Sequence, residues 1–333
     1  MTFTPLKIMF LISLLSGSIL AISSSSWFSA WVGLELNLMS FIPLISSKKN
    51  KILSEAALKY FLVQALGSAL IIFSASLIIL PMGSLPLIIS LGLLLKLGAA
   101  PFHFWFPQVM EGLNWIQALI LMTIQKLAPM FLTSYLVCNH FCYSLIFLVA
   151  LTSAAVGALS GLNQVSLRKI LAYSSINHMS WMLFSMLINE TLWMIYFTMY
   201  SIISLSVVMI FNSIQAFYFT HLTNNSKTPL SKIIPIFSLY SLGGLPPFTG
   251  FIPKWFIIQE MMNSSFFLPL FVLLLSSLIT LYFYIRLTLS SISLLFTQNK
   301  WDAPFKLDPS PSVPLSSLIN LFGLLIPSSL MII

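Results

Sequence analysis

Residues 91–106 read LGLLLKLGAAPFHFWF and place one lysine, Lys96, inside an apolar run that ends in a Gly-Ala-Ala-Pro break followed by a histidine. The rest of the chain has the same character, because 58% of its 333 residues are hydrophobic and only 7% are charged. A soluble domain carries about 25% charged residues, which keep its surface hydrated. The composition therefore predicts an integral membrane protein, in which Lys96 needs an explanation.

Eleven apolar segments are long enough to cross a bilayer, since a transmembrane helix needs about 20 residues. The first resembles a signal peptide but is longer than a usual signal core, so it is interpreted as a span. The expected fold class is an all-α polytopic membrane protein. The predicted spans lie near 3–22, 27–46, 56–80, 84–106, 113–137, 142–160, 169–187, 192–219, 231–262, 266–290 and 314–333.

The basic residues are distributed asymmetrically between the two sides that these spans define. The N-terminus and the even-numbered loops, counted with the span ends that adjoin them, hold ten lysine and arginine residues, and the odd-numbered loops and the C-terminus hold none. This pattern predicts that the N-terminus faces the side of synthesis and the C-terminus the opposite side. It also explains the net charge of +8 without a nucleic-acid partner. These residues are Lys7, Lys48, Lys49, Lys51, Arg168, Lys169, Lys227, Lys232, Lys300 and Lys306.

A sequence pattern similar to that of the Lys96 region recurs later in the chain. With a one-residue insertion, LGAAPFHFWFP at 97–107 aligns with LGGLPPFTGFIP at 242–253, in spans four and nine. The two copies are five spans apart, and this odd offset makes them cross the membrane in opposite directions. Paired interrupted helices of this kind indicate a transport site. We expect one membrane domain over 1–333, with a five-helix repeat at 1–137, an inverted repeat at 138–290, and a positive-side loop with a final helix at 291–333.

Three lysines, Lys96, Lys126 and Lys254, lie inside predicted spans with no short route to the headgroups. Each is close to a proline, which removes the hydrogen bond to the carbonyl four residues earlier. In hydrocarbon a freed carbonyl must find another partner, so each break favours a small polar pocket. Pro101 would free the carbonyl of Leu97, Pro129 that of Gln125, and Pro246 and Pro247 those of Leu242 and Gly243.

The energetic cost of these lysines favours a functional role. Each costs roughly 2.5–3.5 kcal/mol at the centre of a span, in a chain otherwise sparing of charge. An apolar surrounding disfavours the charged form of a lysine and a nearby carboxylate favours it, so such a lysine can load and release a proton. Glu35, near the centre of the second span, is the predicted partner of Lys96 by depth alone. Structural ion pairing is the alternative for all four residues.

Weaker candidates complete the predicted proton path. His103 and His178 titrate near neutral pH and could relay protons, or could be hydrogen-bonded packing residues. Glu55 and Lys59 are four apart and can pair on one helix face near the positive-side surface. That pair is more often structural than mechanistic.

Other chemistry is not predicted for this chain. Its two cysteines, Cys138 and Cys142, form no disulfide framework or convincing metal site. There is no Walker loop, no dinucleotide-binding glycine motif after a strand, and no ligand spacing for haem, iron–sulfur or zinc. Any redox chemistry or ATP hydrolysis that drives the protein is therefore expected in another chain.

Several stretches together resemble a known family: WVGLELNLMSFIPLIS, SEAALKYFLVQA, KLGAAPFHFWFPQVMEGLNW, QKLAPM, GLNQVSLRKILAYSSINHMSW and SLGGLPPFTGFIPKW. They are similar in order and spacing to the antiporter-like membrane subunits of mitochondrial NADH–ubiquinone oxidoreductase (respiratory complex I), specifically chain 2 in its animal form. The resemblance covers about residues 27–260. The last 70 residues match mainly in span pattern, and their richness in Ser and Phe departs from the family.

The resemblance implies a core membrane subunit that couples NADH-to-ubiquinone electron transfer in other subunits to proton translocation. The family's glutamate–lysine couple falls on Glu35 and Lys96, its central lysine on Lys126 and its terminal-half lysine on Lys254. FMN, iron–sulfur clusters and ubiquinone are expected in partner subunits, with no cofactor or metal here. The implied location is the mitochondrial inner membrane, with the N-terminus in the matrix, the C-terminus in the intermembrane space, and contacts to other membrane and accessory subunits and to lipid such as cardiolipin.

Two other functions are compatible with the same residues. One is a free-standing cation/proton antiporter of the same architecture, which would run alone on a native gel. The other is a scaffold subunit whose intramembrane charges are only structural. Replacing Lys96 or Lys126 by Met in an assembling complex distinguishes pump from scaffold, because a scaffold would assemble and pump at full rate.

Overall fold

The structure is a computed structural model that describes residues 5–46, 50–77, 85–225 and 229–293. Within these ranges all regular elements are helices, fourteen in number. The predicted eleventh span, 314–333, lies outside the described residues. The chain divides into two compact units, Met1–Ser153 and Ala154–Ile333, and the division falls inside one helix, α8.

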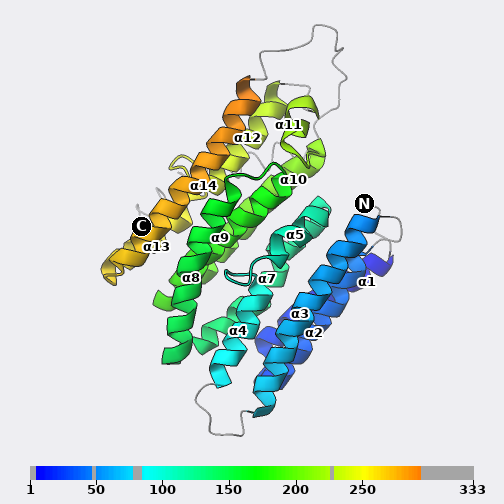
Figure 1. Ribbon diagram of the computed structural model, residues 1–333, viewed down its shortest axis with the longest axis vertical. Helices are drawn as coiled ribbons and strands as arrows, with labels where there is room; N and C mark the ends of the chain where they lie inside the picture. Colours follow the sequence, from blue (N-terminus) through cyan, green and yellow to red (C-terminus); the bar gives the residue numbers. More distant parts are fainter. Residues whose placement is uncertain (1–4, 47–49, 78–84, 226–228, 294–333) are drawn as a thin grey trace, which may run out of the picture. The chain divides into compact units, whose positions relative to one another are not determined.

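The first unit contains seven helices and the first half of an eighth. Three long helices pack side by side at its N-terminal end, and shorter helices follow (Figure 1). In order they are α1 (Pro5–Ser23), α2 (Trp27–Ile45), α3 (Lys51–Leu77), α4 (Leu85–Leu97), α5 (Trp105–Gly112), α6 (Trp115–Met122), α7 (Ile124–Leu136) and α8 (His140–Gly161).

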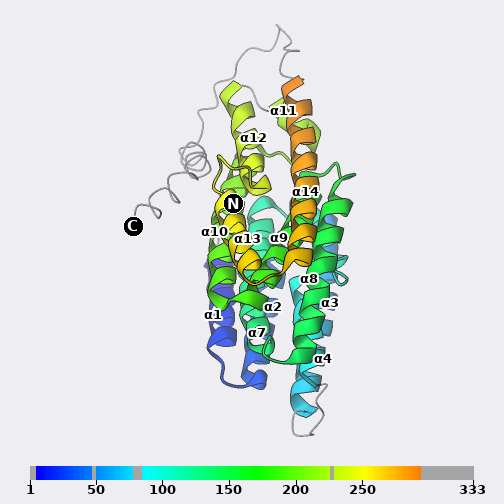
Figure 2. The ribbon, with the colours of Figure 1, turned by 90° about the vertical axis from the view of Figure 1, so that its left-hand side faces the viewer.

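The second unit contains the rest of α8 and six further helices. The helix α10 packs against α9 and α12, and α14 runs beside α12 (Figure 2). In order they are α9 (Leu167–Ile188), α10 (Glu190–Ile214), α11 (Phe219–Asn225), α12 (Pro229–Gly243), α13 (Phe251–Asn263) and α14 (Phe267–Ser293).

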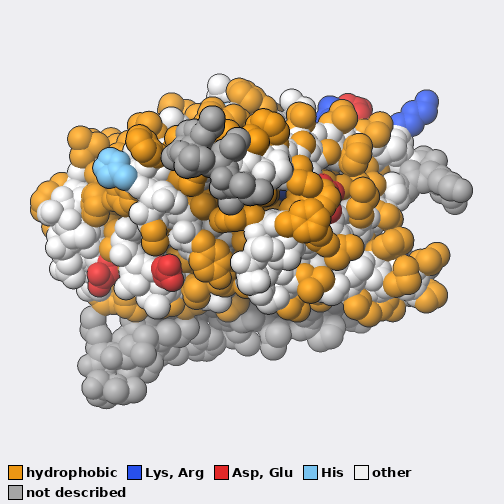
Figure 3. Space-filling view, turned by 90° about the horizontal axis from the view of Figure 1, so that it is seen from below, with side chains coloured by type: hydrophobic (Ala, Val, Ile, Leu, Met, Phe, Trp, Pro, Cys, Tyr) orange, Lys and Arg blue, Asp and Glu red, His pale blue; other side chains and the backbone are white. Residues whose placement is uncertain are grey.

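The prediction of a membrane protein is supported by the surface of these helices. Large apolar side chains such as Leu6, Ile12 and Leu62 are more than 60% exposed, as expected of residues that face lipid. In the view from below in Figure 3, hydrophobic side chains are widespread and few charged side chains appear. Within the described part, seven segments are long and apolar enough to span: Pro5–Ser23, Trp27–Ile45, Lys51–Leu77, Trp115–Leu136, His140–Gly161, Glu190–Ile214 and Phe267–Leu289.

These seven segments coincide with seven of the predicted spans, and three other predicted spans differ in form. The predicted span 169–187 is the continuous helix α9, which carries buried polar residues such as Asn177 and is less apolar. The predicted spans 84–106 and 231–262 are each interrupted, as their Gly and Pro residues indicated, and their apolar helices are short. The eleven-span count is therefore not established by the described residues.

Local hydrogen bonds explain where the helices begin and how their polar groups are paired in an apolar surrounding. Ser26 caps α2, because its hydroxyl accepts from the backbone N–H of Ser29 at 3.3 Å while the two hydroxyls lie 2.8 Å apart. Buried serines inside the helices bond the carbonyl three residues earlier, as Ser185 does with Met182 at 2.8 Å. The many serines of the spans are thus compatible with membrane burial.

One interruption was not predicted. The expected span 113–137 is divided at Thr123, whose backbone (φ −114°, ψ −78°) separates α6 from α7. The Thr123 hydroxyl bonds the carbonyl of Leu119 at 2.8 Å, and the N–H of Lys126 bonds the carbonyl of Thr123 at 3.0 Å. Irregular turns inside helices are frequent at functional sites, and this one directly precedes Lys126.

Candidate proton-handling sites

The first interruption ends α4 with a left-handed glycine. Gly98 has φ +69°, its N–H bonds the carbonyl of Leu95 at 3.2 Å, and the N–H of Ala99 bonds the carbonyl of Leu94 at 3.3 Å. This pair of bonds is the Schellman arrangement, which favours glycine because a β-carbon is strained at positive φ. The indole N–H of Trp105, the first residue of α5, also donates to Leu95 at 3.1 Å.

The second interruption has the same geometry. Gly244 has φ +79°, its N–H bonds the carbonyl of Ser241 at 3.2 Å, and the N–H of Leu245 bonds the carbonyl of Tyr240 at 3.4 Å. Seven residues separate the helices in both breaks, 98–104 and 244–250. The sequence alignment that paired Gly98 with Gly243 was therefore wrong by one residue. The two left-handed glycines correspond, and no insertion is needed.

Lys96 lies in the last turn of α4 and is 6% exposed. Its aliphatic chain passes the point where α3 and α4 cross, since a β-carbon on Gly67 would lie 3.0 Å from the Lys96 Cγ and 3.2 Å from the Gly92 carbonyl oxygen. Gln64 donates from its side-chain amide to the Lys96 carbonyl at 3.2 Å. The lysine is thus fixed by α3 through both its backbone and its side chain.

Glu35 is half-buried on α2 and interacts electrostatically with Lys96 and with Tyr60. In the described first unit, Glu35 and Lys96 do not approach within the 4.0 Å of a salt bridge. The glutamate–lysine couple therefore stays a prediction, with the two groups in one compact unit.

Lys126 lies in the first turn of α7 and is 2% exposed. Its Nζ lies 4.8 Å from the centre of the Phe106 ring, a distance at which an ammonium is attracted to the ring face. Pro129 lies in the same helix, as the sequence indicated. The buried side chain therefore lies against an aromatic ring, and its backbone N–H is bonded to the irregular turn at Thr123.

A hydrogen-bonded network that the sequence did not predict lies beside Lys126. The hydroxyl of Tyr60 donates to the Gln125 side-chain carbonyl at 3.0 Å, and the Gln125 amide donates to the Asn37 side-chain oxygen at 2.9 Å. Tyr60 and Asn37 are each 2% exposed. The only signal in the sequence was the presence of polar residues inside apolar spans, which does not reveal which ones meet.

Lys254 lies in α13, in the second unit, and is 5% exposed. Its Nζ donates to the carbonyl of Gly243, the last residue of α12, at 2.7 Å, and lies 5.9 Å from the centre of the Trp181 ring. The sequence predicted a freed carbonyl at Gly243 and a lysine near it. The structure joins the two directly.

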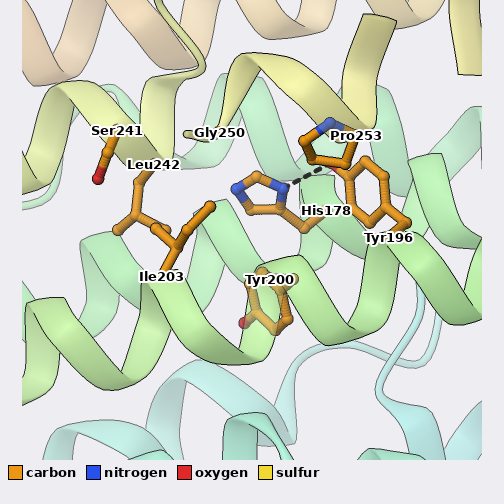
Figure 4. Close-up of a pocket in the computed structure, with 8 residues that line it drawn as sticks. All are labelled: His178, Tyr196, Tyr200, Ile203, Ser241, Leu242, Gly250 and Pro253. Carbon is orange, nitrogen blue, oxygen red and sulfur yellow. Dashed lines mark hydrogen bonds between the residues drawn. The ribbon is translucent and has the colours of Figure 1, made fainter. Parts of the chain in front are cut away.

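His178 lies on α9 beside a small cavity next to the second break. Its Nδ1 is 2.8 Å from the Tyr196 hydroxyl, and its ring centre lies 5.1 Å from that of Tyr200. Figure 4 shows the imidazole between Tyr196 on one side and Leu242 and Gly250 on the other. The cavity of about 10 Å³ is lined by these residues and by Ile203, Ser241 and Pro253, and it can hold about one water molecule.

The remaining predicted residues are less closely connected to the lysines. His103 is buried in the first break, and its Nδ1–H donates to the Pro101 carbonyl at 3.3 Å. Glu55 and Lys59 form a salt bridge of 2.7 Å on α3, with exposed side-chain fractions of 65% and 44%. No group of three or more His, Cys, Asp or Glu in the described ranges is arranged to hold a metal ion.

Comparison with known proteins gives a consistent result. A family model described as "NADH:quinone oxidoreductase/Mrp antiporter, TM" matches residues 24–280. The chain is 50% identical over 304 residues to NADH-ubiquinone oxidoreductase chain 2 of Anopheles gambiae, covering 88% of this chain and 87% of that protein. It is 38% identical over 338 residues to the Locusta migratoria protein of the same name, covering 98% of each.

Solved structures share the fold. The chain superimposes on a chain of respiratory complex I from Thermus thermophilus with a TM-score of 0.83 at 24% identity, covering 98% of this chain and 80% of that one. An archaeal membrane-bound sulfane sulfur reductase gives 0.81 at 17% identity, with 96% and 73% covered. At these identities the likeness shows the antiporter-like fold alone. The sequence matches go further: the chain belongs to the NADH:quinone oxidoreductase/Mrp antiporter family, and within it to the NADH-ubiquinone oxidoreductase chain 2 group.

Proposed function

We propose that Lys96, Lys126 and Lys254, with Glu35, move protons through this chain, which is a membrane subunit of respiratory complex I. The observation that carries this is the placement of the lysines. Each is buried, and each lies beside an irregular or interrupted helix: Lys96 and Lys254 at the two breaks, and Lys126 after Thr123. Ionisable groups inside a membrane are costly and accordingly mark ion pathways.

The breaks provide what a proton-carrying lysine needs. A helix end exposes carbonyls without partners inside the helix, and the Gly243 carbonyl accepts from the Lys254 Nζ at 2.7 Å. At the first break, Glu35 on α2 is the proposed partner of Lys96, since a carboxylate near a lysine favours the protonated form of the lysine. A change in the distance or protonation of Glu35 would therefore load or unload Lys96. His178, His103, Glu55 and Lys59 are proposed as lesser members of the path.

The proposed function also implies an arrangement of spans and repeats in the membrane. We infer eleven spans, with inverted five-helix repeats at 1–137 and 138–290, and a loop and final helix at 291–333. The shared pair of Schellman bonds and the seven-residue length of the two breaks support the internal symmetry. Lysine and arginine place the N-terminus on the positive side, which is the matrix if the protein lies in the mitochondrial inner membrane like its relatives.

The partners are proposed from the same relationship. Electron transfer from NADH to ubiquinone would occur in other subunits, which would hold FMN, the iron–sulfur clusters and ubiquinone. The chain itself would contact further membrane and accessory subunits and lipid, including cardiolipin, and no nucleic acid. Its exposed apolar side chains suit both lipid and neighbouring helices.

The test replaces Lys96, Lys126 or Lys254 by Met in the assembled complex, with Lys51→Met as a control because Lys51 is exposed at the start of α3 and is not part of the proposed path. We expect each buried variant to assemble and to lower proton pumping and coupled NADH oxidation at least about tenfold, a loss of roughly 1.4 kcal/mol of transition-state stabilisation. Lys51→Met should keep most of the activity. Full-rate pumping by all three buried variants would reject the proposed path and favour a scaffold.

A further inference from the structure

We propose that Tyr60 and Gln64, on one face of α3, are positioning residues that hold Lys126 and Lys96 in the orientation that proton transfer requires. The inference rests on the proposed function of these lysines and adds a role for α3. Neither residue titrates near neutral pH, and neither was among the residues that the sequence singled out.

The two residues belong to one buried stripe. Tyr60, Gln64 and Gly67 follow one another at spacings of four and three, which places them on one face of a helix. Tyr60 is 2% exposed and Gln64 is 6% exposed. Glu55 and Lys59 project outward from the same helix at exposed fractions of 65% and 44%. The helix α3 therefore has a polar surface side and a separate polar side inside the protein.

Gln64 fixes Lys96 at the end of its helix. The Schellman bonds of the first break use the carbonyls of Leu94 and Leu95, one and two residues before Lys96. The carbonyl of Lys96 itself is bonded by the Gln64 amide at 3.2 Å. Three residues along the same face, Gly67 leaves just enough room for the Lys96 side chain, since a β-carbon there would lie 3.0 Å from its Cγ.

Tyr60 positions Lys126 through its hydrogen bond to Gln125, the residue that precedes Lys126 in the chain. Its hydroxyl donates to Gln125 at 3.0 Å, and Gln125 in turn donates to Asn37 on α2 at 2.9 Å. The Tyr60 ring is itself held, with centre-to-centre distances of 5.1 Å to Phe41 and 6.0 Å to Trp105. Gln125 is thus bonded from α3 and α2 at the first turn of α7, directly after the irregular turn at Thr123.

The chemistry of these groups indicates positioning rather than conduction. Side-chain amides donate and accept hydrogen bonds but do not take up or give up protons near neutral pH. Tyr60 has one hydroxyl proton, which it directs at the Gln125 carbonyl. A proton cannot pass along Tyr60, Gln125 and Asn37, so this network holds the backbone at Lys126. A misplacement of about 1 Å can reduce the rate of a transfer step about 100-fold.

The experiment compares Gln64→Met with Gln64→His in the assembled complex, with rates normalised to assembled complex on a native gel. Methionine keeps the length but lacks a donor, whereas a neutral histidine keeps an N–H donor at a similar reach. We expect Gln64→Met to lower pumping and the kcat of coupled NADH oxidation about tenfold, with the KM values of NADH and ubiquinone unchanged. Gln64→His should recover most of the activity.

Tyr60 is tested by Tyr60→Phe, which removes the hydroxyl and keeps the packed ring, alone and combined with Asn37→Ala. Because both single changes release Gln125, the loss in the double variant should be smaller than the product of the two single losses. Ser68→Ala is the control: Ser68 is buried on α3, and its hydroxyl bonds only the Ala65 carbonyl of its own helix, at 2.9 Å. It should pump at nearly the full rate.

Three results would overturn the inference: full-rate pumping by Gln64→Met and Tyr60→Phe, equal losses in Gln64→Met and Gln64→His, or losses that disappear on normalisation to assembled complex. If the loss of pumping in the double variant equals the product of the two single losses, Tyr60 does not act through Gln125 and has no positioning role. Lys96→Met and Lys126→Met are measured in parallel. If they pump at full rate, the proposed function itself fails, whereas inactive lysine variants beside active Gln64 and Tyr60 variants overturn only the positioning role.

Discussion

Lys254 shows most directly how a charged residue is accommodated inside this protein. Its Nζ lies against the end of the preceding helix, 2.7 Å from the Gly243 carbonyl and 5.9 Å from the centre of the Trp181 ring. A helix C-terminus carries a partial negative charge, which favours a cation there. The residue is therefore stabilised by backbone, and the described part of the second unit provides no carboxylate in salt-bridge contact with it.

The glycine beside this lysine permits a sharp prediction. A β-carbon on Gly244 would lie 2.9 Å from the Lys254 Nζ, and the residue has φ +79°. Gly244→Ala should displace the lysine and strain the backbone, at a cost of about 1–2 kcal/mol, and lower pumping accordingly. Gly243→Ala is the matched control, because its β-carbon would meet Tyr284 at an ordinary 3.5 Å. Equal pumping by the two variants would contradict the proposed role of Lys254. The measurement is the pumping rate per assembled complex.

At the scale of elements, the sequence revealed some helix interruptions and not others. Gly98 and Gly244 were recognisable because Gly and Pro cluster around them and because the two breaks resemble each other. Thr123 carried no such signal, because no glycine or proline adjoins it in the sequence. The same applies to the bonds between Tyr60, Gln125 and Asn37. Local chemistry can be read from a sequence, whereas the pairing of distant polar residues is decided by packing.

The pairing of α1 with α2 gives a prediction at this scale. A β-carbon on Gly33 would lie 2.6 Å from the backbone nitrogen of Ala21, so the two helices can approach only with glycine there. Gly33→Ala should separate them and destabilise the complex by about 1–3 kcal/mol. The thermal midpoint of the purified complex measures this. Val32→Ala, on the exposed side of α2, serves as the control and should leave the midpoint nearly unchanged. A Gly33→Ala midpoint equal to the control would show that the close approach is not required.

At the scale of the whole molecule, the fold class and the family could be predicted from the sequence, because apolar run length, charge asymmetry and motif order are all linear properties. The predicted Glu35–Lys96 couple was a statement about depth, and within the described residues the two groups form no salt bridge, so the couple stays a prediction. The orientation in the membrane is likewise a prediction from charge alone.

A native cysteine tests that orientation. Cys138 is exposed in the turn between α7 and α8, and Cys142 is buried. The proposed topology places this turn on the side opposite the N-terminus. A membrane-impermeant maleimide should therefore label Cys138 in mitoplasts, where the outer face of the inner membrane is accessible, and fail to label Cys138→Ser. Labelling only in inverted vesicles would reverse the assigned orientation.

The contact between Lys254 and the Gly243 carbonyl has a consequence for how fast the Lys254 amine could gain and lose a proton. A neutral amine still has N–H groups, so it can donate to the same carbonyl as the ammonium does. The anchor atom is therefore common to both states of the side chain, and a proton could leave without the chain swinging to a new partner. A carboxylate partner, by contrast, loses most of its attraction when the lysine becomes neutral. An anchor of this kind keeps the reorganisation energy of each transfer small, because the donor begins and ends the step in the same place.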